Sequence, residues 1–383
     1  MNEIISKNVN SIEISGIRKF YNKVQNYPEA LSLTLGQPDF KVPSKIKKAI
    51  IDAIEKNKTE YTSNAGIEEL REEISFYLKN SFKINFSKEE ICLTVGGSEG
   101  LFSVFSTLIE PGDKVLIPTP AYPAYESCVK ILGGKVINYE LKKDFSINYE
   151  KLEEILKNEK PKAIVISYPS NPTGAILTKE DRDALYNILR DKESIIISDE
   201  IYSSLSFEKD YYSIAQFEDI REKVILVSGF SKMFSMTGLR LGYICASERL
   251  MNGIIKVHQY NVSCAPSIVQ WGALEGLRSC ISEVEYMKNE FIKRRDFVYK
   301  GLVDLGLDVN MPKGAFYIFP SIKKFNLESE DFCERALKEG KIAMVPGNAF
   351  GKGGEGYLRI SYSYSMETLQ EALIRLEKFL GKI

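Results

Sequence analysis

The sequence contains a single histidine, His258, among its 383 residues. A metal site built from several histidines is therefore excluded, and acid–base chemistry has to come from lysine, tyrosine or carboxylate side chains. The six cysteines are scattered and form no C-x-x-C pair. This pattern argues against a thiolate zinc site and is typical of reduced thiols in a cytoplasmic protein. We expect no bound metal.

An excess of either charge is also missing, because 51 lysines and arginines are balanced by 52 aspartates and glutamates. Without a basic excess we expect no nucleic-acid partner. The apolar runs, such as 163–166 and 195–197, have the length of strands and are too short to cross a membrane. The first residues lack the apolar core of a signal peptide. We therefore expect a cytoplasmic protein without a membrane partner.

Short β-branched runs alternate with longer helical segments along most of the chain. This rhythm predicts an α/β fold with a mostly parallel sheet between helices. The chain exceeds the usual size of one compact core, and its last part has a mixed pattern that predicts a smaller α+β domain. The predicted strands of the sheet are 91–95, 114–117, 163–167, 194–198, 224–228 and 242–246, with helices at 100–109, 123–132 and 179–191.

A long helical segment from residue 267 to about residue 305 is expected to bridge the two domains. The smaller domain should then contain strands at 315–319 and 357–363 and helices at 329–339 and 366–380. We predict residues 1–45 as an N-terminal arm and part of the small domain, 46–285 as the large cofactor-binding domain, and 286–383 as the small C-terminal domain.

Two glycine motifs each allow more than one interpretation. Residues 351–356 satisfy G-x-G-x-x-G, but a predicted strand follows them where a dinucleotide site needs a helix, so we interpret them as a mobile loop. Residues 96–100 satisfy G-x-S-x-G after a strand, which permits an α/β-hydrolase with Ser98, Asp199 and His258. The same turn at a helix start also suits a phosphate.

Other polar clusters follow the predicted strands. Asn171-Pro172-Thr173-Gly174 is a common turn on its own, Asp199-Glu200-Ile201-Tyr202 could be a helix cap, and Lys232 could be a solvated lysine. However, the carboxyl ends of strands in an open α/β sheet are where ligands bind. Two arginines complete the set: Arg240 before a strand and Arg359 between apolar neighbours within one.

Together these residue types define one chemistry. A lysine amine can form a Schiff base with an aldehyde cofactor, and an acid can keep a pyridine nitrogen protonated. A glycine-rich helix start with an arginine can hold a phosphate. These requirements match pyridoxal 5'-phosphate (PLP), whereas the hydrolase explains only Ser98, Asp199 and His258.

On these motifs the sequence closely resembles the class I/II, fold-type I PLP-dependent aminotransferases. Residues 231–243 (SKMFSMTGLRLGY) resemble the lysine signature of that family. The start of the chain, residues 15–20 (SGIRKF), resembles the prokaryotic aspartate/aromatic aminotransferase subgroup. The other matching segments, in the family's order, are 36–39, 61–62, 171–174, 199–202, 312–317, 346–351 and 357–361.

The resemblance implies a seven-stranded sheet, PLP as cofactor and a ping-pong Schiff-base mechanism. It implies that Lys232 binds the cofactor aldehyde and then moves the proton at the substrate α-carbon. Asp199 would pair with the pyridinium nitrogen, Tyr202 and Asn171 would hydrogen-bond the phenolic oxygen, and Tyr122 would stack on the ring.

The resemblance also implies the anion sites. Gly97, Ser98 and Arg240 would hold the phosphate. Many relatives carry Ser or Thr three residues before the lysine, where this chain has Gly229, so Ser231 is the candidate that replaces the missing hydroxyl.

Arg359 would grip the substrate α-carboxylate as a bidentate fork, aided by Asn171 and the Gly36 backbone. Tyr61 would reach the phosphate of the neighbouring subunit, which implies a homodimer with shared active sites.

Two alternatives remain on the same scaffold: a carbon–sulfur β-lyase, which uses the same lysine and acid, and a PLP-binding regulator. For a transaminase, the segment that covers the side-chain pocket offers Ile17, Phe20 and Tyr21, and the resemblance gives Arg18 a structural role. Some aspartate-specific relatives carry a lysine where this chain has Ser98. We therefore expect an uncharged, aromatic or long donor, with 2-oxoglutarate or pyruvate as acceptor.

Overall fold

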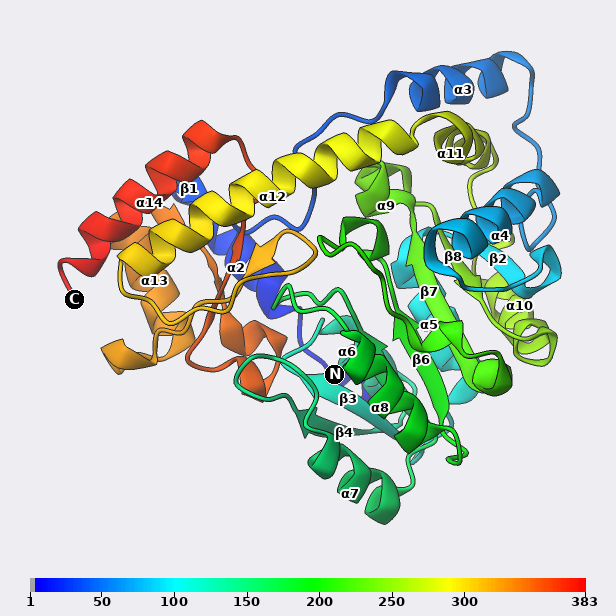
Figure 1. Cartoon of the computed structure of the whole chain (residues 1–383), viewed down its shortest axis with the longest axis horizontal. Coiled ribbons are helices and arrows are strands. Elements are labelled where there is room, and N and C mark those ends of the chain that lie inside the picture. Colours follow the sequence, from blue (N-terminus) through cyan, green and yellow to red (C-terminus); the bar gives the residue numbers. More distant parts are fainter. Residues whose placement is uncertain (1–3) are drawn as a thin grey trace.

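A computed structural model describes residues 4–383 of the chain (Figure 1). Within this range, seven strands form one sheet in the order β2-β8-β7-β6-β5-β3-β4, and β8 alone runs antiparallel to its neighbours. The mostly parallel seven-stranded sheet is therefore confirmed. Its strands are β2 Ile91–Thr94, β3 Lys114–Thr119, β4 Lys135–Glu140, β5 Ala163–Ser167, β6 Ile195–Asp199, β7 Val224–Gly229 and β8 Gly242–Cys245.

Both faces of this sheet are covered by helices, which explains why its central strands are continuous apolar runs. Ile196 and Ile197 are both fully buried, and they belong to two different cores on opposite faces. One face is covered by α5 Gly96–Leu108, α6 Ala124–Ile131 and α10 Glu248–Val262, and the other by α4 Glu68–Phe82, α7 Tyr149–Glu159, α8 Lys179–Leu189 and α11 Ser267–Ser279.

Strand β4 is the strand of this sheet that the sequence analysis missed. It lies at the edge of the sheet and most of its residues are exposed or half-buried. A polar edge strand has no continuous apolar run, so the pattern that predicts the central strands does not detect it.

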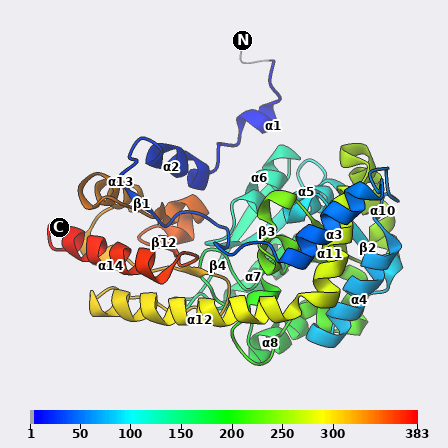
Figure 2. The ribbon, with the colours of Figure 1, turned by 90° about the horizontal axis from the view of Figure 1, so that it is seen from above.

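The predicted long helix of residues 267–305 is wrong in one respect, because it consists of α11 and α12 (Ile281–Asp304). Cys280 separates them with φ −125° and ψ 22°, outside helical geometry. The break lets α11 pack beside α3 (Ser44–Glu55), while α12 continues across to the second part of the molecule (Figure 2).

The smaller part of the molecule combines both ends of the chain. Strand β1 (Leu31–Ser32) pairs in parallel with β10 (Ile342–Ala343), and β12 (Leu358–Ser361) lies between β11 (Val345–Pro346) and β9 (Tyr317–Ile318). Helices α2 Gly16–Val24, α13 Ser329–Gly340 and α14 Met366–Leu380 pack around these strands, and α1 Lys7–Asn10 precedes them. The proposed boundary at 285/286 falls within α12.

The glycine motif at 351–356 contains a short 3₁₀ turn, Lys352–Gly354, and Gly353 donates its backbone N–H to Thr119 Oγ1 at 2.9 Å. Strand β12 follows it, so the turn lacks the helix that a dinucleotide site requires. No helix within residues 4–383 is long and apolar enough to span a bilayer.

Candidate active site

A cavity of about 440 Å³ lies at the carboxyl ends of β5, β6 and β7, beside the small part of the molecule. Its walls bring together eleven of the twelve site residues that the sequence analysis named. Tyr61 is the exception, with a side chain that is 87% exposed. The residues in the walls are Gly36, Gly97, Ser98, Tyr122, Asn171, Asp199, Tyr202, Ser231, Lys232, Arg240 and Arg359.

Lys232 lies on the short helix α9 (Phe230–Met233), directly after β7. Its Nζ donates a hydrogen bond to the Gly36 carbonyl at 2.5 Å. Burial, followed by the positive charges of Arg359 and Arg240, lowers the pKa of Lys232 to about 8. A larger fraction of its amine is therefore uncharged near neutral pH than for an ordinary lysine, which is the form that attacks an aldehyde.

Asp199 ends β6, and its carboxylate is buried. Oδ2 accepts a hydrogen bond from the Tyr125 hydroxyl at 2.6 Å, and Oδ1 accepts one from the Ile201 N–H at 3.1 Å. Burial raises the pKa of Asp199, and these hydrogen bonds only partly oppose it. A protonated pyridine nitrogen is the kind of cation that such a carboxylate would stabilise.

Arg359 is 1% exposed and lies in β12. Nη1 donates to Asn171 Oδ1 at 3.1 Å and Nη2 donates to the Thr34 carbonyl at 2.6 Å. Nε is buried without a hydrogen-bond partner among the described residues. Because a buried guanidinium N–H normally has an acceptor, this group fits a carboxylate ligand.

The Tyr202 hydroxyl, which the resemblance assigns to the cofactor, shares a hydrogen bond of 2.8 Å with the Tyr317 hydroxyl. The Tyr317 ring also lies under the guanidinium of Arg359, 4.5 Å from its carbon. The sequence analysis missed Tyr125, Tyr317 and Thr34 as site residues. Tyr125 carried one signal, since it lies in the first turn of the predicted helix 123–132, close in sequence to Tyr122.

The start of α5 forms a close cradle with Arg240. A Cβ on Gly96 would lie 2.6 Å from Arg240 Nη2, and a Cβ on Gly242 would lie 2.7 Å from the Gly97 nitrogen. Side chains at these two positions would therefore fill the cradle. Free N–H groups at a helix start beside an arginine fit a phosphate.

The same geometry leaves no room for a side chain at Gly229. A Cβ on Gly229 would lie 2.7 Å from Gly242 Cα and 3.0 Å from the Leu241 carbonyl oxygen, so a side chain there would collide with backbone. Ser231 lines the cavity two residues later and offers a hydroxyl.

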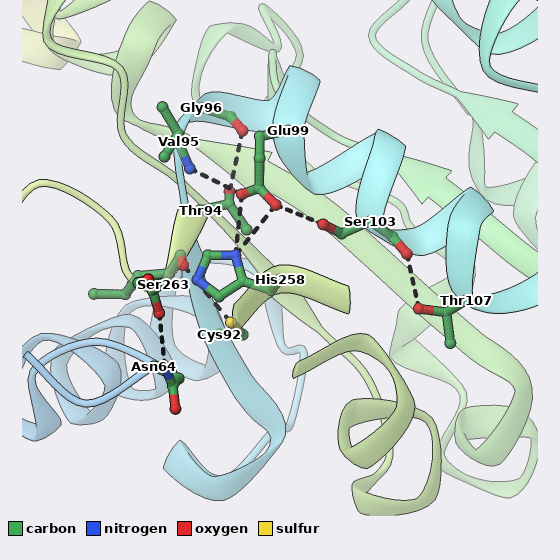
Figure 3. Close-up of polar contacts among 11 residues, drawn as sticks. Asn64, Cys92, Thr94, Val95, Gly96, Glu99, Ser103, Thr107, His258 and Ser263 are labelled. Carbon is green, nitrogen blue, oxygen red and sulfur yellow. Dashed lines mark hydrogen bonds and ion pairs between the residues drawn. The ribbon is translucent and has the colours of Figure 1, made fainter. Parts of the chain in front are cut away.

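The hydrolase hypothesis is wrong, because the three residues do not form a triad. His258 is fully buried, and its Nδ1 lies 3.1 Å and 3.2 Å from the two carboxylate oxygens of Glu99 (Figure 3). Asp199 is instead hydrogen bonded by Tyr125. With its one histidine bound to Glu99, the site has no histidine to activate Ser98, and the proposed triad cannot form.

The family model described as "Aminotransferase class I and II" matches residues 28–376. The chain belongs to this family. It is therefore a PLP-dependent transaminase of fold type I, and the residues described above fit the aldehyde, ring, phosphate and carboxylate that this chemistry requires. The β-lyase and the PLP-binding regulator are not favoured.

Similar proteins include other transaminases over almost the whole length of the chain. This aminotransferase is 43% identical to a probable N-acetyl-LL-diaminopimelate aminotransferase of Bacillus subtilis, covering 100% of this chain and 97% of that protein. It is 41% identical to a probable aspartate aminotransferase of Methanocaldococcus jannaschii, covering 97% of this chain and 98% of that protein. The crystal structure of an aromatic aminotransferase from Pyrococcus horikoshii superimposes with a TM-score of 0.90 at 38% identity. The superposition covers 95% of this chain and 99% of that chain.

Proposed function

We propose that this aminotransferase takes the amino group from an L-amino acid with an uncharged, aromatic or long side chain. The acceptor in the second half of its ping-pong cycle would be 2-oxoglutarate or pyruvate. The observation that carries this proposal is the pairing of an arginine fork for the α-carboxylate with the apolar side chain of Ile17 and the ring of Tyr21 in the same cavity.

PLP, when bound, supplies an aldehyde carbon that condenses with an amine and a ring that withdraws electrons from the α-carbon of that amine. Lys232 is the amine of this chain that the substrate displaces and that afterwards carries the proton from the substrate α-carbon. Its pKa of about 8 supports this role, because a group with a pKa near the working pH can both accept and return a proton.

The other residues hold the reacting groups in place. Asp199 keeps the ring nitrogen protonated, and Tyr125 holds the Asp199 carboxylate through its hydroxyl. Tyr202 and Asn171 bind the phenolic oxygen and Tyr122 covers the ring.

The two anionic groups have separate sites. Gly97, Ser98, Ser231 and Arg240 hold the phosphate. Arg359 binds the α-carboxylate with its Nε and Nη groups, with support from Asn171 and the Gly36 backbone.

The side-chain pocket supports an uncharged donor. Ile17 and Tyr21 of α2 line the cavity, and Ser98 stands where some aspartate-specific relatives carry a lysine. Two expectations are corrected: Phe20 packs in the core of the small part, and Arg18 lines the cavity.

The Arg18 guanidinium lies 5.6 Å from the Tyr21 ring centre and its side chain is exposed, so it remains hydrated and contributes little to selecting a buried carboxylate. The names of the relatives cover aspartate, aromatic and diaminopimelate-type substrates, so the pocket has to decide between them.

A homodimer with shared active sites completes the proposal. Tyr61 is 87% exposed, and Tyr260, which is 89% exposed, is another large side chain without cover in one subunit. Tyr61 would reach the phosphate in the partner's site. All six cysteines are free, which is consistent with a cytoplasmic location.

A panel of amino acids tests the proposed donor. Each is mixed with the PLP-loaded enzyme while the absorbance change from the aldehyde to the amine form of the cofactor is followed. Phenylalanine, tyrosine or methionine should react faster than aspartate. Release of pyruvate from cysteine-type substrates, without net amino transfer, would instead indicate a β-lyase.

A further inference from the structure

Glu99 follows Ser98 in the first turn of α5, and its side chain, which is 8% exposed, organises the start of that helix (Figure 3). Its Oε2 accepts the backbone N–H of Val95 at 3.0 Å, and its Oε1 accepts the hydroxyl of Ser103. One carboxylate therefore joins the residue before the glycine turn to the helix that follows it.

His258, from α10, fixes the orientation of this carboxylate. A carboxylate can only accept, so the contacts of 3.1 Å and 3.2 Å place an N–H of His258 Nδ1 between the two oxygens of Glu99. In this orientation Oε2 faces Val95 and Oε1 faces Ser103. Burial alone would raise the pKa of Glu99, but the hydrogen bonds from His258, Ser103 and Val95 outweigh it and the pKa lies below its usual value.

The contact with Glu99 is the one hydrogen-bonded contact that the His258 ring makes within residues 4–383. His258 is fully buried, and its Nε2 has no hydrogen-bond partner among residues 4–383. A buried polar atom without a partner is destabilising, and an apolar side chain in its place would avoid that loss. What the histidine provides is its contact with Glu99.

We propose that Glu99 and His258 are a positioning pair that sets the glycine turn of residues 95–98 in the conformation that receives the cofactor phosphate. This inference rests on the proposed phosphate site of Gly97, Ser98 and Arg240. Neither residue of the pair touches the phosphate. They act by holding the Val95 N–H, so that the next N–H groups of the turn point at the anion.

The test uses the cofactor-free full chain and pyridoxamine 5'-phosphate, which carries the phosphate but has no aldehyde for Lys232. E99D keeps the charge and shortens the reach to Val95, E99Q keeps the reach without the charge, and H258A removes the donor. We expect E99D and H258A to raise the dissociation constant about tenfold, as for the loss of one hydrogen bond. E99Q should stay within about threefold of the wild type, since its amide oxygen still accepts from Val95.

Two further readouts separate positioning from general damage. The affinity for pyridoxamine, which lacks the phosphate, should not change, and the ³¹P resonance of bound pyridoxamine 5'-phosphate should shift in E99D and H258A. T107A is the matched control, because Thr107 lies on the same helix and donates to the Ser103 carbonyl at 2.8 Å. It should leave both affinities unchanged.

Unchanged affinity for the phosphate ligand in folded E99D and H258A would overturn the inference, and so would equal losses for both ligands. A loss in E99Q as large as in E99D would also contradict it. If H258A does not fold, the affinities of E99D and E99Q for pyridoxamine 5'-phosphate still test the inference. The affinity of R240A for pyridoxamine 5'-phosphate is measured alongside. If R240A loses affinity and the Glu99 and His258 variants do not, only this inference is refuted. If R240A keeps its affinity, the proposed phosphate site itself is refuted.

Discussion

Replacing Asp199 by asparagine tests the electron-withdrawing role of the bound ring. The change removes a negative charge with almost no change of shape. Asp199 is 6% exposed, so the carboxylate and the ring nitrogen would form a buried ion pair. Loss of one partner from such a pair costs about 3–5 kcal/mol, which lowers the rate by about two to almost four orders of magnitude.

The stability of the cofactor-free chain should move in the opposite direction. Burial raises the pKa of Asp199 above its unfolded value, so its ionisation destabilises the fold as the pH rises through the folded-state pKa. D199N removes this cost and should raise the melting temperature at pH 7 in the absence of PLP.

The assay is single-turnover conversion of the PLP-loaded enzyme by a good amino donor, followed by absorbance. Y125F is the matched variant, since it keeps the charge and removes the hydrogen bond of 2.6 Å to Asp199. It should lose less than D199N, about tenfold to one hundredfold. Near-normal turnover in D199N, with the cofactor fully bound, would refute the role of Asp199.

Three further predictions concern the lysine, the subunits and the donor. PLP should attach to the cofactor-free chain at a rate that rises with pH and levels off above about 8, because only the uncharged amine of Lys232 attacks; stopped-flow absorbance checks this, and a rate still rising at pH 10 would contradict the lowered pKa. Mixing K232A with Y61A subunits should restore part of the activity that each lacks, and exchange of subunits without any recovery would count against shared sites. Specificity constants should favour phenylalanine or methionine over aspartate, and a tenfold lead for aspartate, about 1.4 kcal/mol, would overturn the proposed donor class.

The central strands can be predicted because both of their faces are buried. Residues 195–197 are apolar without interruption, whereas β4 mixes polar and apolar residues at the sheet edge and escapes detection. The break at Cys280 escapes for another reason. No glycine or proline stands between α11 and α12, so a local pattern gives no sign that the helix ends there.

The residues of the site likewise divide into those that a local sequence pattern predicts and those that only packing brings together. Asn171, Asp199 and Lys232 follow strands that are neighbours in a parallel sheet, so sequence alone brings them to one edge. Tyr125 and Tyr317 contact Asp199 and Tyr202 across more than 70 residues of sequence, and such contacts are set by packing. The pair of Glu99 and His258 is hidden for the same reason.

The central claim is that Lys232 is the residue that bonds to the cofactor, and one measurement tests it most directly. The PLP-loaded enzyme is reduced with borohydride, digested and sequenced by mass spectrometry. The account predicts the cofactor on the peptide that contains Lys232, and K232A should bind PLP without being labelled. Labelling of a different lysine, or no labelling of the wild type, would contradict the account.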